Sequence, residues 1–99
     1  MPYRLIDPGE TLDYACDWAA FLADAGSPGD TIATSTWSIA PSMGSPPAPV
    51  LSGEQTIGAV TTVFVSGAAL GSVYRLTNAI MTSQGRTAQR SFTIRCDSR

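Results

Sequence analysis

The side chains that could carry out chemistry are few in this chain of 99 residues. It has no histidine and no lysine, which excludes serine–histidine and cysteine–histidine nucleophilic sites and histidine metal ligands. The best-placed carboxylates, Asp13 and Asp17, would lie about 13 Å apart on a strand, at roughly 3.3 Å per residue. Because glycosidases need about 5–9.5 Å between two carboxyl groups, we interpret these aspartates as a solvated strand face.

Metal and phosphate sites are not indicated either. Calcium needs several clustered oxygen ligands, and the segment GSPGDT at residues 26–31 offers one carboxylate and is typical of a turn. The glycines at 67 and 71 follow a predicted strand but lead into no phosphate-binding loop. We therefore expect no metal, no cofactor and no enzymatic activity.

The two tryptophans and the two cysteines all fall at apolar positions of predicted strands. Trp18 and Trp37 could form a platform that stacks on sugars, but we favour core tryptophans. Cys16 and Cys96 could lie adjacent across the core and form a disulfide, which would stabilise the fold by about 4 kcal/mol if unstrained. We favour two small buried hydrophobic side chains instead.

Apolar and polar residues alternate along much of the chain, which is typical of half-buried strands. In TLDYACDWAA, residues 11–20, the apolar side carries Leu12, Tyr14, Cys16 and Trp18. In TIATSTWSIA, residues 31–40, one side carries Ala33, Ser35, Trp37 and Ile39. The segment IGAVTTVFVSG, residues 57–67, predicts a further strand.

The segments between these strands have the composition of connections. DWAAFLADA, residues 17–25, predicts a short helix or a bulge at the end of a strand, and GSPGD, residues 26–30, predicts a turn. PSMGSPPAP, residues 41–49, is expected to be a surface connection that cannot pair in a sheet, because proline lacks the backbone donor.

The most detailed prediction concerns the hairpin over residues 73–96, VYRLTNAIMTSQGRTAQRSFTIRC. If even-numbered residues of both strands face inward, the loop must hold three residues, 83–85, with Gly85 in the left-handed conformation. This register places Leu76 opposite Phe92 and Tyr74 opposite Ile94, and a slip of one residue would expose all of them. Tyr74 could bond its hydroxyl back to a connection, as in Greek-key sandwiches, or be an ordinary strand tyrosine.

Several short strands with turns about every ten residues indicate an all-β fold, an immunoglobulin-like antiparallel β-sandwich of about seven strands and Greek-key type. Residues 1–99 would form this single domain. The chain lacks a run of apolar residues long enough to span a membrane and a signal-peptide pattern at its start. We therefore expect synthesis in the cytoplasm, with free cysteine thiols.

Charge is sparse and uneven. Charged residues make up 14% of the chain and the formal net charge is −2, which argues against a general nucleic-acid binder. Residues 1–30 hold six acids and one arginine, a net of −5, whereas residues 75–99 hold five arginines and one aspartate, a net of +4. These ends could pair inside the domain or could join copies head to tail.

Arginines near the C-terminus offer forked donors that suit bidentate contacts with carboxylates of a neighbour. A solvated strand face is the alternative interpretation. The candidate assembly contacts are Arg86, Arg90, Arg95, Asp13 and Asp17.

Four segments together resemble a known family. They are LDYACDWAAFL, DTIATSTWSIAP, TTVFVSGAALGSVYRLTN and GSVYRLTNAIMTSQGRTAQRSFTIR, and they cover residues 12–95 with some gaps and one overlap. The resemblance is to the small fiber-tail adaptor proteins of tailed bacteriophages, and the last segment also resembles the final hairpin of many immunoglobulin-like modules.

The resemblance implies a non-enzymatic virion protein, synthesised in the host bacterial cytoplasm and carried in the phage tail. It implies several copies around the tail, joining the tail body to the fibers, with tail tube, nozzle, adaptor and fiber N-terminal regions as partners and no nucleic acid or membrane. The alternative that we keep is a virion surface or decoration module with weak carbohydrate binding. The resemblance brings no catalytic or cofactor residue.

Overall fold

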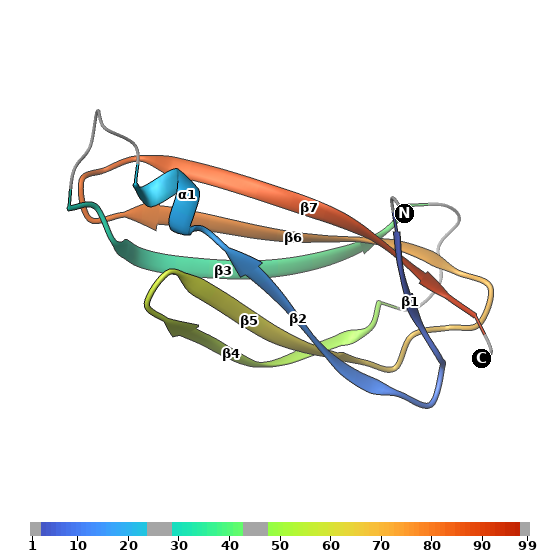
Figure 1. Ribbon diagram of the computed structural model, residues 1–99. Helices are drawn as coiled ribbons and strands as arrows, with labels where there is room; N and C mark the ends of the chain where they lie inside the picture. The colour runs from blue at the N-terminus through green and yellow to red at the C-terminus, as the bar shows by residue number, and fades with distance from the viewer. Residues whose placement is uncertain (1–2, 24–28, 43–47, 98–99) are drawn as a thin grey trace.

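The computed structural model describes residues 3–23, 29–42 and 48–97, which form seven strands and one helical turn (Figure 1). The elements are β1 (Tyr3–Ile6), β2 (Thr11–Asp17), α1 (Ala19–Leu22), β3 (Ile32–Pro41), β4 (Val50–Ile57), β5 (Val60–Ser66), β6 (Val73–Thr82) and β7 (Thr87–Cys96). The prediction of an all-β sandwich of about seven strands is confirmed.

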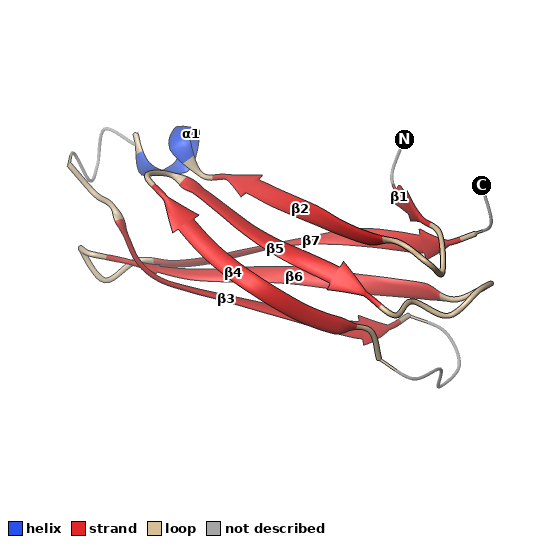
Figure 2. Ribbon diagram, turned by 90° about the horizontal axis from the view of Figure 1, so that it is seen from below, coloured by secondary structure: helices blue, strands red, loops and turns tan. Residues whose placement is uncertain are grey.

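The strands form two layers (Figure 2). One sheet has the order β1-β7-β6-β3 and the other has the order β2-β5-β4. The grouping of the second, fifth and fourth strands against the third, sixth and seventh is that of an immunoglobulin-type sandwich. One detail differs from the expected antiparallel sandwich, because β1 runs parallel to β7. The chain enters alongside the end of β7 and then turns into the other sheet at residues 7–10.

The first long strand follows its alternating pattern. Tyr14, Cys16 and Trp18 are buried, whereas Asp13 and Asp17 are exposed. The strand passes directly into α1, where the Asp17 carboxylate accepts a 2.9 Å hydrogen bond from the backbone N–H of Ala19. Of the short helix and the bulge that the sequence left open here, the helix is the one present, at Ala19–Leu22.

The predicted register of the β6–β7 hairpin is also confirmed. Leu76 lies opposite Phe92 and Tyr74 opposite Ile94. Gly85 has a φ of 85°, and the loop is closed by the Thr82 N–H, which donates to the Arg86 carbonyl at 2.7 Å. Only glycine adopts this left-handed conformation without strain.

Tyr74 is fully buried, and its hydroxyl accepts a 3.0 Å hydrogen bond from the backbone N–H of Ala69 in the β5–β6 connection. Of the two interpretations, the one that bonds this hydroxyl to a connection is confirmed. The bond ties the loop that joins the two sheets to the start of β6.

Two strand predictions need correction. Ala33 is exposed rather than inward, because a bulge between Ile32 and Thr34 adds one residue and shifts the alternation. Residues 57–67 are not one strand: Gly58, with a φ of 59°, and Ala59 form a turn between β4 and β5. Two strands, β4 and β1, are therefore absent from the predicted set.

The proline-rich connection, expected over residues 41–49, is shorter than predicted. Pro41 is the last residue of β3 and lies opposite Tyr74, and Pro49 is buried just before β4. Proline is tolerated at such a strand end because no ladder donor is required there. The rest of that prediction, residues 43–47, lies outside the described residues.

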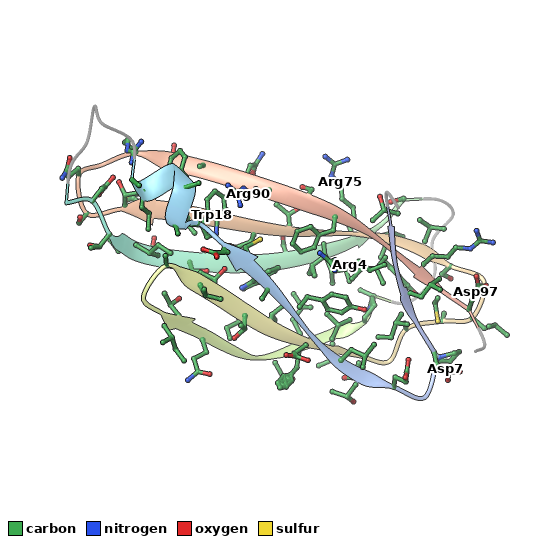
Figure 3. All side chains as sticks on the ribbon, viewed as in Figure 1. Arg4, Asp7, Trp18, Arg75, Arg90 and Asp97 are labelled. Atoms are coloured by element: carbon green, nitrogen blue, oxygen red, sulfur yellow. The ribbon has the colours of Figure 1, made fainter. Side chains whose placement is uncertain are left out.

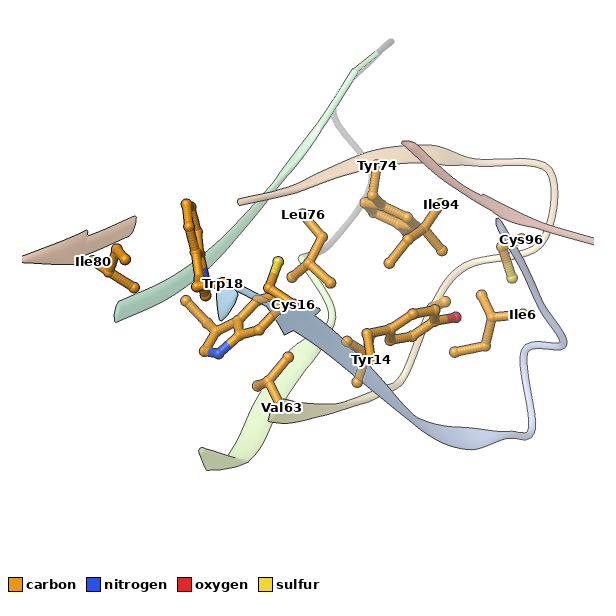
Figure 4. Close-up of a cluster of buried hydrophobic side chains, with 13 residues drawn as sticks. Ile6, Tyr14, Cys16, Trp18, Val63, Tyr74, Leu76, Ile80, Ile94 and Cys96 are labelled. Carbon is orange, nitrogen blue, oxygen red and sulfur yellow. The ribbon is translucent and has the colours of Figure 1, made fainter. Parts of the chain in front are cut away.

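The buried hydrophobic side chains form one core cluster, with residues from both sheets (Figure 4). Its fully buried large side chains include Trp18, Tyr74, Leu76, Ile94 and Val63. Both tryptophans are buried, at 1% exposure for Trp18 and 5% for Trp37, which confirms the core interpretation and leaves no tryptophan platform for sugars.

Candidate assembly surfaces and polar clusters

A buried asparagine joins the two sheets. The Asn78 side chain on β6 is fully buried; its Oδ1 accepts hydrogen bonds from Trp18 Nε1 at 2.8 Å and from Thr61 Oγ1 at 2.7 Å. Its Nδ2 donates to Ser35 Oγ at 2.9 Å and to the Thr36 carbonyl at 3.2 Å. We call these five residues the Asn78 cluster. All four bonding positions of the amide are used, so its burial is compensated.

Asn78 is a functional residue that the predictions above do not include, although its position in β6 gives a signal. Position 78 has the same parity as the inward positions 74, 76 and 80, so the sequence predicts an amide among apolar side chains. An asparagine at such a position predicts a hydrogen-bonded partner inside the core. The partners lie on β3, on β5 and at Trp18 between β2 and α1, and no local pattern could name them.

A second cluster lies at the α1 end of the sandwich. The Asp30 carboxylate, with no exposed side-chain surface, accepts hydrogen bonds from the Ser83 hydroxyl and the Gln84 N–H, both at 3.0 Å. It also forms a 3.0 Å ion pair with Arg86 Nε. We call Asp30, Ser83, Gln84 and Arg86 the Asp30 cluster.

The Asp30 cluster sets the charge state of its carboxylate. Burial acts to raise the pKa of Asp30, but hydrogen bonds from Thr82, Arg86, Gln84 and Ser83 together outweigh it and hold the pKa well below its ordinary value. Asp30 is therefore ionised throughout the physiological range.

Arg86, predicted as an assembly contact, is engaged within the chain. Besides its bond to Asp30, it donates to the Phe21 carbonyl at 3.2 Å and lies 4.3 Å from the centre of the Phe21 ring. This arrangement brings the acidic first third of the chain to the basic C-terminal part. Internal pairing of the two ends is therefore confirmed at this point.

Arg90 is exposed and extends across the side of the sandwich onto β2 (Figure 3). Its guanidinium lies 4.3 Å from the centre of the Trp18 ring and donates to the Asp17 carbonyl at 2.8 Å. Figure 3 also shows Arg75 projecting away from the sandwich. Arg95 is exposed and pairs with Asp97 at 2.9 Å. This ion pair contributes little to stability, because both side chains are exposed to solvent.

Asp13 and Asp17 lie on the outer face of the β2-β5-β4 sheet. Phe64, at 40% exposure, lies directly opposite Asp13 on this face. The outer face of the other sheet is mostly hydroxyl-bearing, with a hollow of about 440 Å³ lined by side chains that include Thr34, Thr36 and Thr87. The candidate residues are therefore spread over several surfaces and form no single site.

The two cysteines are free and buried, so the disulfide considered from the sequence is not formed. Cys16 lies on β2 beside Trp18 and Leu76, whereas Cys96 lies at the end of β7 beside Ile6 (Figure 4). Burial raises the pKa of both thiols; Arg90 and Arg4 partly oppose this at Cys16, and Asp7 and Asp97 add to it at Cys96. Both are therefore protonated, unreactive core side chains.

Within the described ranges, no group of three or more histidine, cysteine or carboxylate residues could hold a metal ion. In the same part of the chain, no helix has the length and apolar character needed to cross a bilayer.

The chain matches the family described as Podophage GP4 fiber-tail adaptor protein gp77 over residues 7–95. The chain belongs to this family. A search among curated proteins found no match. The matched range of this fiber-tail adaptor begins just after β1 and ends one residue before the end of β7, so it covers six of the seven strands.

Membership confirms the resemblance stated from the sequence and supports a structural role in a phage tail.

Proposed function

We propose that this domain is a non-enzymatic adaptor that joins the body of a phage tail to its fibers through protein–protein contacts. The observation that carries the proposal is the family match, which spans residues 7–95 and therefore the paired strands from β2 to β7. Two sheets tied by the Asn78 cluster give a stiff body, which suits a part that holds two partners at a fixed geometry.

The proposal includes several copies around the tail and contacts that involve neither nucleic acid nor a membrane. The exposed candidate contacts are Asp13, Asp17, Arg90 and Arg95, which are charged side chains suited to the polar rim of an interface. Arg86 stays a candidate contact; its side chain is 23% exposed, and its Nε is already bound to Asp30.

A knockout of the gene in its phage tests the function. Virions made without this chain are expected to carry complete tail bodies that lack fibers, as seen by electron microscopy, and to regain fibers when the wild-type chain is supplied from a plasmid. Fibers on virions made without the chain would refute the proposal, as would wild-type virions in which the chain lies away from the tail.

A further inference from the structure

One edge of the larger sheet is partly uncovered. The bonds from Thr82 N–H to the Arg86 carbonyl and from Cys96 N–H to the Ser72 carbonyl, at either end of the hairpin, show that even-numbered β7 residues bond to β6. Odd-numbered residues of β7 therefore direct their backbone groups away from β6. β1 pairs only with residues 93–96, so it does not reach the first half of β7.

Three residues along this uncovered edge, Thr87, Gln89 and Ser91, have exposed side chains and turn backbone N–H and C=O groups outward. In the described ranges, no strand pairs with them on that side. We call residues 87–91 the open β7 edge. Unpaired backbone groups in a row are a template for another extended chain.

The opposite edge of the same sheet, β3, is protected. It has a bulge at Ala33 and ends in Pro41, and between them the Glu54 carboxylate accepts a 3.3 Å hydrogen bond from the Trp37 N–H. Bulges, prolines and charged side chains are the devices by which sheets block added strands. The open β7 edge has no bulge and no proline.

Cations flank the open β7 edge. Arg90 lies on it. Arg4 of β1 lies just beyond it, with its guanidinium carbon 5.4 Å from the centre of the Phe92 ring. In the part of the chain that the structure describes, neither arginine has a carboxylate within ion-pair distance. Phe92 and Ala88 are only partly buried at inward positions of the same strand. The edge thus offers backbone groups, apolar contact and positive charge together.

We propose that an extended segment of the tail fiber protein adds to the open β7 edge as a further strand, with carboxylate side chains facing Arg90 and Arg4. The mode is strand addition, in which main-chain bonds give affinity and alternate side chains give specificity. The partner's identity rests on the proposed adaptor function. A second copy fits less well, because antiparallel pairing of two β7 edges would bring the two Arg90 side chains together.

The test uses the purified N-terminal region of the fiber from the same phage as the probe. Amide hydrogen exchange is followed by NMR on the isotope-labelled wild-type chain, and binding is measured by calorimetry for wild type, Gln89→Pro and Ala15→Pro. Gln89→Pro removes one outward N–H and leaves the β6 ladder intact. Ala15→Pro is the matched control on β2. There the hydrogen bond from Arg90 to the Asp17 carbonyl shows that odd-numbered residues direct their backbone groups away from the paired strand β5.

We expect exchange at residues 87, 89 and 91 to slow at least tenfold on binding, Gln89→Pro to bind at least tenfold more weakly, and Ala15→Pro to bind as wild type does. The exchange experiment needs no variant, so it decides even if Gln89→Pro folds poorly. Tight binding with these amides unprotected, or loss of binding in Ala15→Pro alone, would refute strand addition at the open β7 edge. Neither result would refute the proposed adaptor function.

Two further outcomes separate the partner from the edge. If the fiber region does not bind the wild-type chain, the fiber contact of the proposed function fails and this inference fails with it. If the wild-type chain self-associates in sedimentation experiments and Gln89→Pro abolishes it, the edge joins copies of this chain, and the fiber segment is the wrong occupant.

Discussion

Two clusters of buried polar side chains in the described part of the chain differ in charge and position. The Asn78 cluster is neutral, lies within the sandwich and joins both sheets. The Asp30 cluster is built on an ion pair and joins the residues before β3 to the β6–β7 loop at one end. Each satisfies its buried atoms, as burial requires.

The difference indicates what each cluster controls. The hydrogen bonds of a neutral network do not depend on ionisation, so the Asn78 cluster should hold the two sheets together at acidic and neutral pH alike. A carboxylate stabilised by donors becomes sensitive to acid. The Asp30 cluster should therefore make one end of the sandwich the acid-labile end.

Asn78→Ala is expected to have the largest effect on stability. It leaves Trp18 Nε1 and the Thr61 hydroxyl buried without their acceptor and opens a small cavity, which together should cost about 3 kcal/mol of unfolding free energy. Urea denaturation measures this at neutral pH. Gln89→Ala, an exposed change on the neighbouring strand, is the control and should stay within about 0.5 kcal/mol. Equal losses for the two variants would show that the amide network contributes nothing.

Asp30→Asn should destabilise the protein at neutral pH by less than Asn78→Ala does, and the loss should shrink in acid. The pKa of Asp30 is lowered in the folded chain relative to an unfolded value of about 3.9. Its contribution is therefore complete above that value and is lost as pH falls toward the folded pKa.

Urea midpoints at pH values of about 7 and about 2.5 check this. The gap between wild type and Asp30→Asn should narrow at the lower pH. Asp97→Asn, which removes an exposed ion pair, is the matched control and should change little at neutral pH. If the difference in urea midpoint between wild type and Asp30→Asn stays constant with pH, the Asp30 cluster is no more sensitive to acid than the Asn78 cluster.

Gly85→Ala sharpens the comparison, because Gly85 shapes the loop that carries the donors to Asp30. An added Cβ meets no atom within 4 Å, so the cost is the left-handed backbone alone, about 1–2 kcal/mol. The control is Gly9→Ala, where the Cβ would make an ordinary contact with Asp7 and φ is not positive. If thermal unfolding ranks Gly9→Ala as the more damaging change, the loop does not depend on this conformation.

Tyr74→Phe gives the value of one hydroxyl outside both clusters. Loss of the bond from the Ala69 N–H should cost about 1 kcal/mol, measurable as a lower urea midpoint with an unchanged slope. Exchange of the Ala69 amide should become faster. An Ala69 amide that exchanges as slowly as in wild type would show that the hydroxyl is not its main acceptor.

Local sequence patterns correctly predicted those features of the strands that depend only on residues near each other in the chain. The parity of β6 and β7 with one loop glycine predicted the hairpin register, and the alternation in β2 predicted its buried side. The β3 pattern failed at Ala33 because the bulge adds a residue that the alternation does not reveal. The strand predicted over residues 57–67 failed because its apolar run continues through the Gly58 turn.

The sequence by itself determined an all-β sandwich, the hairpin register, the core tryptophans and the absence of histidine chemistry, because these depend on composition and on a period of two. Only the tertiary structure decided that Arg86 pairs with Asp30, 56 residues away, that Asn78 bonds across the core and that Cys16 and Cys96 lie apart. It also decided that the free edge of β3 is blocked and that the first half of β7 is open in the described part of the chain. Such contacts arise from the way strands distant in sequence are placed side by side, and no local pattern specifies that placement.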